Sequence, residues 1–311
     1  MSPSKPSKTE SFKIIFAGLD NAGKTSIIKT LLREVSKIAI IKATKGAQRR
    51  EYEFLGIKIG EWDLGGHQRY RDKYLEQPDL IFGGTEICIY VMDVQDKQRI
   101  PKSLNYLQQI INKFIMLEIN PSVYVLFHKD DPDFTEDVKK EISRLIREVI
   151  NNINKIPDYD NFSFYTTSIF EIKSIIKAMS EILLIKFPIS DQIRNLIHDF
   201  ARKINAEGIE ILDNNTLMIG AYYKESRIKK ILDSTSPYFL EVHDSFEKVQ
   251  KEPWSVDDQM LVQKEGVFFH FRKFLLRRES PPYFIFICSP TKELDSEAYN
   301  KFIRELRAII Y

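Results

Sequence analysis

The chain has 311 residues, a length that suggests about two domains. Hydrophobic residues make up 43% and charged residues 29% of it, which is ordinary for a globular protein with an apolar core. The formal net charge of +2 argues against a nucleic acid or an anionic membrane as a partner held by charge alone. Two cysteines, Cys88 and Cys288, lie in apolar runs and indicate reduced core thiols of a cytosolic protein.

The first ten residues are polar and lack the apolar core of a signal peptide, so we expect residues 1–10 to be a disordered leader. Ser2 excludes myristoylation by the usual motif, and the final RAIIY is no prenylation box. No apolar run approaches the roughly 18 residues that cross a bilayer. The five histidines have no metal-ligand spacing, so no zinc site is predicted. We expect a cytoplasmic protein that is recruited to a membrane surface only by a partner.

Residues 18–26 read GLDNAGKTS and have the G-x-x-x-x-G-K-[ST] spacing of a phosphate-binding loop. An apolar run at 12–17 predicts the strand before this loop, and residues 25–35 predict the helix after it. Lys24 would supply charge to the β and γ phosphates, and Thr25 a hydroxyl to Mg²⁺. A plain glycine turn between a core strand and a core helix is the weaker interpretation. The other loop residues that we expect to bind nucleotide are Asp20, Asn21, Ala22, Gly23 and Ser26.

Residues 38–50 are basic and weakly patterned, which predicts a mobile, solvated loop. Residues 52–55 and 57–62 predict two strands joined at Gly56, and the second ends in the sequence WDLGGH. Asp63 at the strand end can hold Mg²⁺ through water, and Gly66 can lend its N–H to the γ-phosphate, so this loop would sense that phosphate. Alone, the motif would be a simple turn; beside a phosphate loop it predicts a switch.

Alternating strands and helices complete the first domain. Near-continuous apolar runs at 87–94 and 123–128 predict strands buried on both faces of a parallel sheet, and residues 162–165 predict another strand. Helical periods occupy 101–116, 135–150 and 172–187. This order predicts a three-layer α/β domain with a mostly parallel sheet, which Pro188 ends.

Two loops after these strands carry groups suited to guanine. In the sequence HKDD, Lys129 could pack over a purine, and Asp131 could accept hydrogen bonds from guanine N1 and N2, a donor pair that adenine lacks. A backbone N–H near Ser168 and Ile169 could reach guanine O6. As an ordered set, these groups predict GTP and GDP as ligands.

From Ser190 the order of elements changes. Helices are predicted at 193–204, 227–249 and 292–310, and Pro237 should kink or break the second. Strands are predicted at 209–213, 216–223, 260–264, 267–277 and 283–288, with Asn214 and Asn215 as a two-residue hairpin turn. This order indicates a smaller α+β domain with an antiparallel sheet.

These motifs resemble those of the Ras-like small GTPases. The sequences GLDNAGKTS and WDLGGH are similar to the Arf and Sar branch, whereas HKDD, and TSIF followed by a helix, resemble the Rag/Gtr branch over residues 12–188. The Rag/Gtr likeness continues into a roadblock-like or longin-like domain, which the Arf and Sar branch lacks. The resemblance implies a GTPase domain at 11–188, a dimerisation domain at 189–311, and Thr44 as a ligand of Mg²⁺ and the γ-phosphate.

The chain departs from the family pattern at three places. His128 replaces the Asn that usually tethers the base-binding loop, although an imidazole can still donate one hydrogen bond. His67 stands where many members have Gln, and it either orients the attacking water or is a plain loop residue. No arginine finger is evident near Ile41 and Lys42, and hydrolysis should therefore be slow without an activator.

The leading hypothesis is a GTP-binding switch of Rag/Gtr type that uses Mg²⁺, hydrolyses GTP slowly to GDP, and changes partners through residues 37–50 and 63–80. Activating (GAP) and exchange (GEF) proteins are the implied regulators. The alternatives are a nucleotide-locked scaffold that does not turn over, an Arf/Sar-like trafficking GTPase, and a P-loop kinase or ATPase, which HKDD and TSI disfavour.

The second domain predicts a dimer, either of identical chains or with a related GTPase. An antiparallel sheet leaves open edges, and pairing at residues 260–264 would extend it across two subunits. A monomer whose edge is covered by the linker near Pro253 and Trp254 is the alternative. The candidate apolar contacts, some of which must serve the core, are Ile228, Ile231, Leu232, Phe239, Leu240 and Val242.

Overall fold

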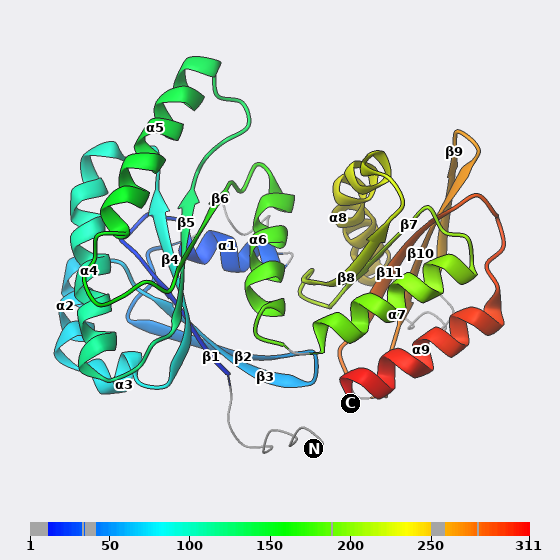
Figure 1. Ribbon diagram of the computed structural model, residues 1–311, viewed down its shortest axis with the longest axis horizontal. Coiled ribbons are helices and arrows are strands. Elements are labelled where there is room, and N and C mark those ends of the chain that lie inside the picture. The colour runs from blue at the N-terminus through cyan, green and yellow to red at the C-terminus, as the bar shows by residue number, and fades with distance from the viewer. Residues whose placement is uncertain (1–11, 33, 35–41, 188, 250–258, 279) are drawn as a thin grey trace. The chain divides into compact units, whose positions relative to one another are not determined.

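The computed structural model describes residues 12–32, 34, 42–187, 189–249, 259–278 and 280–311 (Figure 1). The chain divides into two compact units, and the main division falls between Ile175 and Ile176; Leu31 and Leu32 group with the second unit. Both residues belong to helix α6 (Ile172–Leu184). The leader at 1–10 and the expected boundary residue Pro188 lie outside the described residues.

The first unit is built on a six-stranded sheet with the order β2-β3-β1-β4-β5-β6. Only β2 is antiparallel to its neighbour; the other pairs are parallel. All seven residues of β5 are buried, as its apolar run at 123–127 predicted, and the sheet confirms the predicted mostly parallel α/β domain. The strands are β1 (Phe12–Ala17), β2 (Ala47–Phe54), β3 (Ile57–Leu64), β4 (Thr85–Asp93), β5 (Ser122–His128) and β6 (Phe162–Thr167).

Helices flank this sheet, and the carboxyl ends of its parallel strands form one loop-bearing edge (Figure 1). A single apolar cluster joins one face of the sheet to four helices, with Tyr90 of β4 and Phe114 of α4 among its fully buried members. The helices of the first unit, besides the first turns of α6, are α1 (Lys24–Leu31), α2 (Gln68–Glu76), α3 (Pro78–Phe82), the 3₁₀ turn η2 (Lys97–Arg99), α4 (Ile100–Met116) and α5 (Glu136–Ile153).

The predicted loop at 38–50 ends too late, because strand β2 already begins at Ala47. Arg49 is not simply solvated: its guanidinium lies 3.6 Å from the centroid of the Trp62 ring, and the Lys13 ammonium lies 3.9 Å from that centroid. Arg50 forms two hydrogen bonds, at 3.1 and 2.9 Å, with the buried carboxylate of Glu61 on β3. Cross-strand pairing therefore gives these arginines partners that the local sequence does not show.

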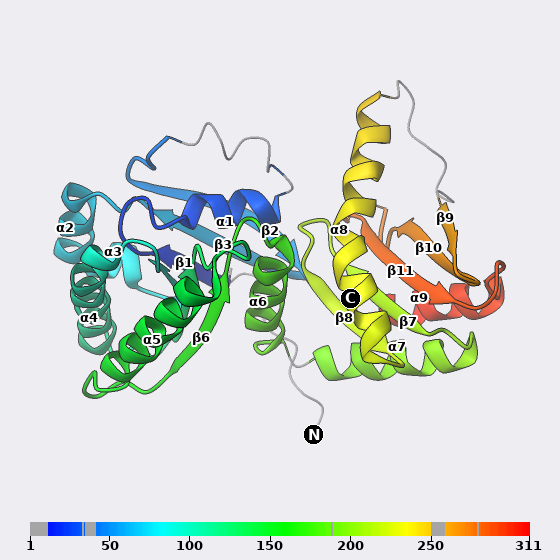
Figure 2. The ribbon, with the colours of Figure 1, turned by 90° about the horizontal axis from the view of Figure 1, so that it is seen from above.

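The second unit contains a five-stranded antiparallel sheet with the order β8-β7-β11-β10-β9, as the element order predicted. Phe271 of β10 packs with Phe239 of α8, whereas the neighbouring Arg272 lies over Tyr299 of α9, so these two helices cover opposite faces (Figure 2). The elements are α7 (Ser190–Lys203), β7 (Gly208–Leu212), β8 (Met218–Tyr223), α8 (Ser226–Val249), β9 (Gln259–Lys264), β10 (Val267–Phe274), β11 (Tyr283–Ser289) and α9 (Ser296–Ile310).

One local prediction in this unit is wrong, and another is wrong in part. The turn between β7 and β8 is longer than the pair Asn214 and Asn215, because the Asp213 carboxylate accepts hydrogen bonds from the N–H groups of Asn215 and Leu217, both at 2.8 Å, and holds a wider loop. Pro237 does not break its helix, since α8 runs through it to Val249. A kink at Pro237, the other predicted outcome, stays a prediction.

One buried carboxylate lies beneath α8. Glu210 of β7 accepts hydrogen bonds from Tyr223, at 2.8 Å, and from Ser236 of α8. Burial, which outweighs these bonds, raises the pKa of Glu210 to about 7. This carboxyl group therefore changes charge near neutral pH.

Both cysteines are buried and free, as predicted, and burial raises the pKa of Cys288 to about 11. Among the helices that the structure describes, none combines the length and the apolar character needed to span a bilayer.

Candidate functional site

The predicted site residues gather at the edge of the first sheet where its parallel strands end. β2 runs the opposite way, so the segment before it, with Thr44, returns to the same edge. A cleft of about 320 Å³ opens there. It is lined by Asp20, Asn21, Gly23, Lys24, Thr25, Ser26, Lys42, Ala43, Thr44, Gly66 and His67.

The phosphate loop holds its lysine in place. The Lys24 ammonium donates to the carbonyls of Gly18, at 3.1 Å, and Leu19, at 2.8 Å, and is buried. Burial lowers the pKa of Lys24 to about 8, against the opposing effect of the Asp63 and Asp20 charges. The amine is thus mostly protonated at neutral pH, as a phosphate ligand needs to be.

Three side chains from different segments meet beside Lys24. Thr25 Oγ1 lies 2.5 Å from Asp63 Oδ2 and 2.8 Å from Thr44 Oγ1, and Thr44 Oγ1 lies 3.2 Å from the same carboxylate oxygen. The other Asp63 oxygen is buried and has no hydrogen-bond partner among the residues that the structure describes. Because Mg²⁺ prefers oxygen ligands, two hydroxyls beside an unsatisfied carboxylate oxygen fit this ion.

Gly66 closes one side of the cleft. A Cβ on this residue would lie 2.1 Å from the backbone nitrogen of Asp20, so only glycine allows the two loops to approach so closely. The buried Arg71 of α2 donates from Nε to the Gly66 carbonyl at 2.9 Å and so fixes this peptide. His67 lines the cleft and is exposed, and its side chain makes no capping hydrogen bond to α2. This position leaves both predicted interpretations of His67 open.

His128 connects the base-binding loop to the phosphate loop by packing. The His128 ring lies close to Gly23, and a Cβ on Gly23 would be 2.3 Å from the imidazole Cδ2. Gly23 also has a φ of +99°, which favours glycine. Nδ1 is 2.9 Å from Thr167 Oγ1. Burial and the neighbouring Lys129 charge lower the pKa of His128 to about 4, so the imidazole is neutral at physiological pH.

The predicted guanine ligands lie beside His128. Lys129 donates to Asp93 Oδ2 at 2.6 Å. The two oxygens of Asp131 accept from Ser168 Oγ, at 2.5 Å, and from Gln95 Nε2, at 2.7 Å. Each carboxylate oxygen has two lone pairs, so both can still accept from a ligand.

One of the two backbone N–H groups predicted to reach guanine O6 already has a partner within the protein. The Ser168 N–H donates to Ser174 Oγ at 3.0 Å. The Ser168 N–H is therefore engaged within the protein, and a base contact through the Ile169 N–H stays a prediction.

Comparison with known proteins decides the family. A family model described as the Gtr1/RagA G protein conserved region matches residues 13–250, well over half of the chain. The chain belongs to the Gtr1/RagA G-protein family. The resemblance to the Rag/Gtr branch is thereby confirmed.

The relatives of this Gtr1/RagA protein include both branches that its motifs resemble. Ras-related GTP-binding protein B of Rattus norvegicus is 24% identical over 188 residues, which are 59% of this chain and 49% of the relative. ADP-ribosylation factor-like protein alp41 of Schizosaccharomyces pombe is 34% identical over 124 residues, or 40% of this chain and 62% of the relative. The match thus spans about half to three fifths of these relatives.

The comparison with solved structures gives one match of low similarity. The structure of the Arl6 BBS3 small GTPase from Trypanosoma brucei, with a bound nucleotide analogue GppNp, is 16% identical and covers 56% of this chain and 96% of its own, with a TM-score of 0.42.

Sequence reasoning missed three residues at the site of this Gtr1/RagA protein. They are Arg71, which holds Gly66, Gln95, which contacts Asp131, and Arg99, which contacts Asp20. Gln95 and Arg99 follow a buried strand at the loop-bearing edge, which was the available signal. Arg71 had no such signal, because it lies in a helix whose sequence is mostly polar.

Proposed function

We propose that this chain is a GTP-binding switch that hydrolyses GTP slowly and signals through the partners it binds in each nucleotide state. Membership in the Gtr1/RagA family supports guanine nucleotide as the ligand class. The cleft beside Lys24 would hold the phosphates, and Asp131 with Ile169 would select guanine.

The observation that carries this proposal is the meeting of Thr25, Thr44 and Asp63 within 3.2 Å. Thr44 and Asp63 come from the two segments predicted to change with the nucleotide. Mg²⁺, when bound by these three residues, would cancel charge on the β and γ phosphates. Loss of the γ-phosphate would remove a shared ligand of both segments and free them to move, which is how such a site acts as a switch.

We propose that hydrolysis is slow because the chain alone supplies too little positive charge to the transferring phosphoryl group. His67 would orient the attacking water from the rim of the cleft. An arginine finger typically adds about 10³ to 10⁵ in rate, and we propose that an activating protein supplies the missing positive charge. An exchange factor would complete the cycle.

The proposal is tested by the nucleotide itself. Protein purified without added nucleotide is denatured, and the released compound is identified by ion-pairing chromatography; GTP or GDP is expected. Single-turnover hydrolysis of GTP is then followed with and without Mg²⁺. ATP as the released compound would contradict the proposal, and bound GTP that never turns over would favour a nucleotide-locked scaffold.

We further propose that the second unit is a roadblock-like domain that forms a dimer with a second copy or a related GTPase. Strand β9 lies at the end of the strand order, as expected. Most of the predicted contacts serve the unit's own core instead: Leu232 and Leu240 are buried, and Ile228 and Phe239 pack against them. The exposed apolar side chains of α8 lie three or four residues apart, at Tyr238, Val242, Phe246 and Val249, with 68, 45, 52 and 83% of their surface exposed.

Light scattering on the full chain at tens of micromolar tests the homodimer. The double variant Val242→Glu and Phe246→Glu should be monomeric, whereas Leu80→Glu, at a side chain that is 58% exposed on α3, should stay dimeric. A monomeric wild type would refute the homodimer and leave a related GTPase as the partner. The alternative cover for the edge, near Pro253 and Trp254, lies outside the described residues. Recruitment from the cytoplasm to a membrane would come through a partner.

A further inference from the structure

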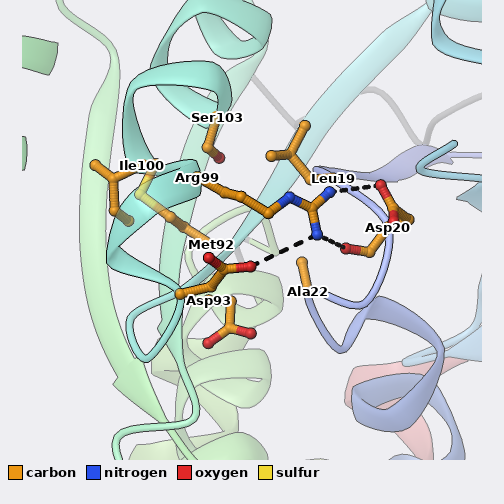
Figure 3. A pocket seen from close by; sticks show the side chains of 9 residues that line it. Leu19, Asp20, Ala22, Met92, Asp93, Arg99, Ile100 and Ser103 are labelled. Carbon is orange, nitrogen blue, oxygen red and sulfur yellow. Dashed lines mark hydrogen bonds and ion pairs between the residues drawn. The ribbon is translucent and has the colours of Figure 1, made fainter. Parts of the chain in front are cut away.

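An arginine outside the predicted site holds the phosphate loop. Arg99 ends the 3₁₀ turn after β4, and its Nη2 donates to the Asp20 carboxylate at 2.6 Å. Its Nη1 donates to the backbone carbonyl of Asp20 at 3.1 Å and lies 3.7 Å from the Asp96 carboxylate. Figure 3 shows the guanidinium of Arg99 pointing at Asp20 from the side of α4. Arg99 thus forms hydrogen bonds with both the side chain and the main chain of Asp20.

Asp20 places a negative charge beside a cleft that is proposed to bind a triphosphate. It lines the cleft together with Lys24 and Thr25, and its backbone nitrogen faces Gly66, the glycine expected to contact the terminal phosphate. A carboxylate turned into this cleft would repel that phosphate, and the repulsion would be strong where both charges are partly shielded from water. Although burial acts to raise it, the hydrogen bond and charge of Arg99 hold the pKa of Asp20 below its ordinary value, so the side chain is ionised.

We propose that Arg99 is a positioning residue that sets the preference for a nucleoside triphosphate over a diphosphate, by holding the Asp20 carboxylate away from the terminal phosphate. The inference rests on the proposed nucleotide function of the cleft. A diphosphate lacks the group that Asp20 would repel, so its binding should depend much less on Arg99. The arginine acts through Asp20 and need not touch the ligand.

The experiment measures the dissociation constants of a non-hydrolysable GTP analogue and of GDP with the full chain in the presence of Mg²⁺. Arg99→Gln should weaken binding of the triphosphate about tenfold, the effect of about 1.4 kcal/mol, and that of GDP less than about threefold. Asp20→Asn in the Arg99→Gln background should restore the ratio, because a neutral amide does not repel the phosphate. Arg99→Lys, which keeps the charge, should show an intermediate loss.

Lys97 provides the matched control. It is a cation on the same 3₁₀ turn, but it pairs with Glu141 at 2.6 Å, away from the phosphate loop. Lys97→Gln should leave the ratio unchanged. Thermal unfolding of every variant separates a loss of folding from a loss of discrimination.

Three outcomes would overturn the inference. Equal weakening of GTP and GDP would mean that Arg99 only supports the fold of the loop. A loss that Asp20→Asn fails to restore would mean that the arginine contacts the phosphates directly. Wild-type protein that binds neither nucleotide would remove the proposed function, and this inference with it; the first two outcomes leave the proposed function standing.

Discussion

Guanine selection at Asp131 is open to a decisive test with Asp131→Asn. The carboxylate would accept from guanine N1 and N2, and hydrogen bonds to a charged acceptor contribute about 1.5–3 kcal/mol each. Asparagine keeps one acceptor oxygen but turns an NH₂ group toward the second donor, so one bond is lost and a buried donor is left unsatisfied, which costs a further 1–3 kcal/mol or so. The sum is about 2.5–6 kcal/mol, or about 10² to 10⁴ in GTP affinity.

The same substitution should favour xanthosine triphosphate, because the new NH₂ group can donate to the carbonyl oxygen at C2 of xanthine. The assay is displacement of a fluorescent guanine nucleotide by GTP or by xanthosine triphosphate. Gln95→Ala is the matched control: it removes a donor that lies 2.7 Å from Asp131 and keeps the carboxylate, so GTP should remain preferred. Unchanged GTP affinity in Asp131→Asn would refute the assignment of this residue to the base.

Three further predictions concern catalysis and stability. The intrinsic rate of GTP hydrolysis, measured by single-turnover kinetics, should be about 10⁻⁴ to 10⁻² per second. The rate should fall in His67→Ala while GTP binding is retained. A rate above about one per second for the isolated protein would contradict this prediction. Arg50→Met should lower the free energy of unfolding by about 3 kcal/mol, since it leaves the buried Glu61 carboxylate unpaired; urea unfolding should show partial recovery in the Arg50→Met, Glu61→Leu double variant. Burial raises the pKa of Glu210 to about 7, so its contribution to stability should be complete below about pH 4.5 and be lost as the pH rises through about 7. Urea titrations at several pH values should show that the free energy of unfolding depends less on pH in Glu210→Gln than in the wild type. The same pH dependence in both proteins would contradict the raised pKa of Glu210.

The sequence predicted the elements whose signal is local. β4 and β5 are buried on both faces, so their apolar runs were sufficient to identify strands. The phosphate loop was identified because the spacing of its glycines, lysine and threonine is itself the requirement for binding phosphate. The family resemblance followed from such motifs, and the match over residues 13–250 confirms it.

The elements that were missed depend on contacts from distant segments. Helix α2 (QRYRDKYLE) buries only Arg71 and Tyr74, so its sequence carries little apolar periodicity. The start of β2 is polar, and its partners, Trp62 and Glu61, lie on the adjacent strand. Gln95 and Arg99 likewise reach the site only when the ends of β1, β4 and β5 are brought to one edge.

The position of Trp62 between two cations gives the molecule an internal optical reporter. It is one of two tryptophans, and the other, Trp254, lies outside the described residues. Trp62 is followed directly by Asp63, and its indole contacts Lys13 of β1 and Arg49 of β2, so a shift of the β2–β3 hairpin against β1 would change the charge next to the ring. In a Trp254→Phe background, intrinsic emission should therefore follow exchange of GDP for GTP in real time and without an attached dye.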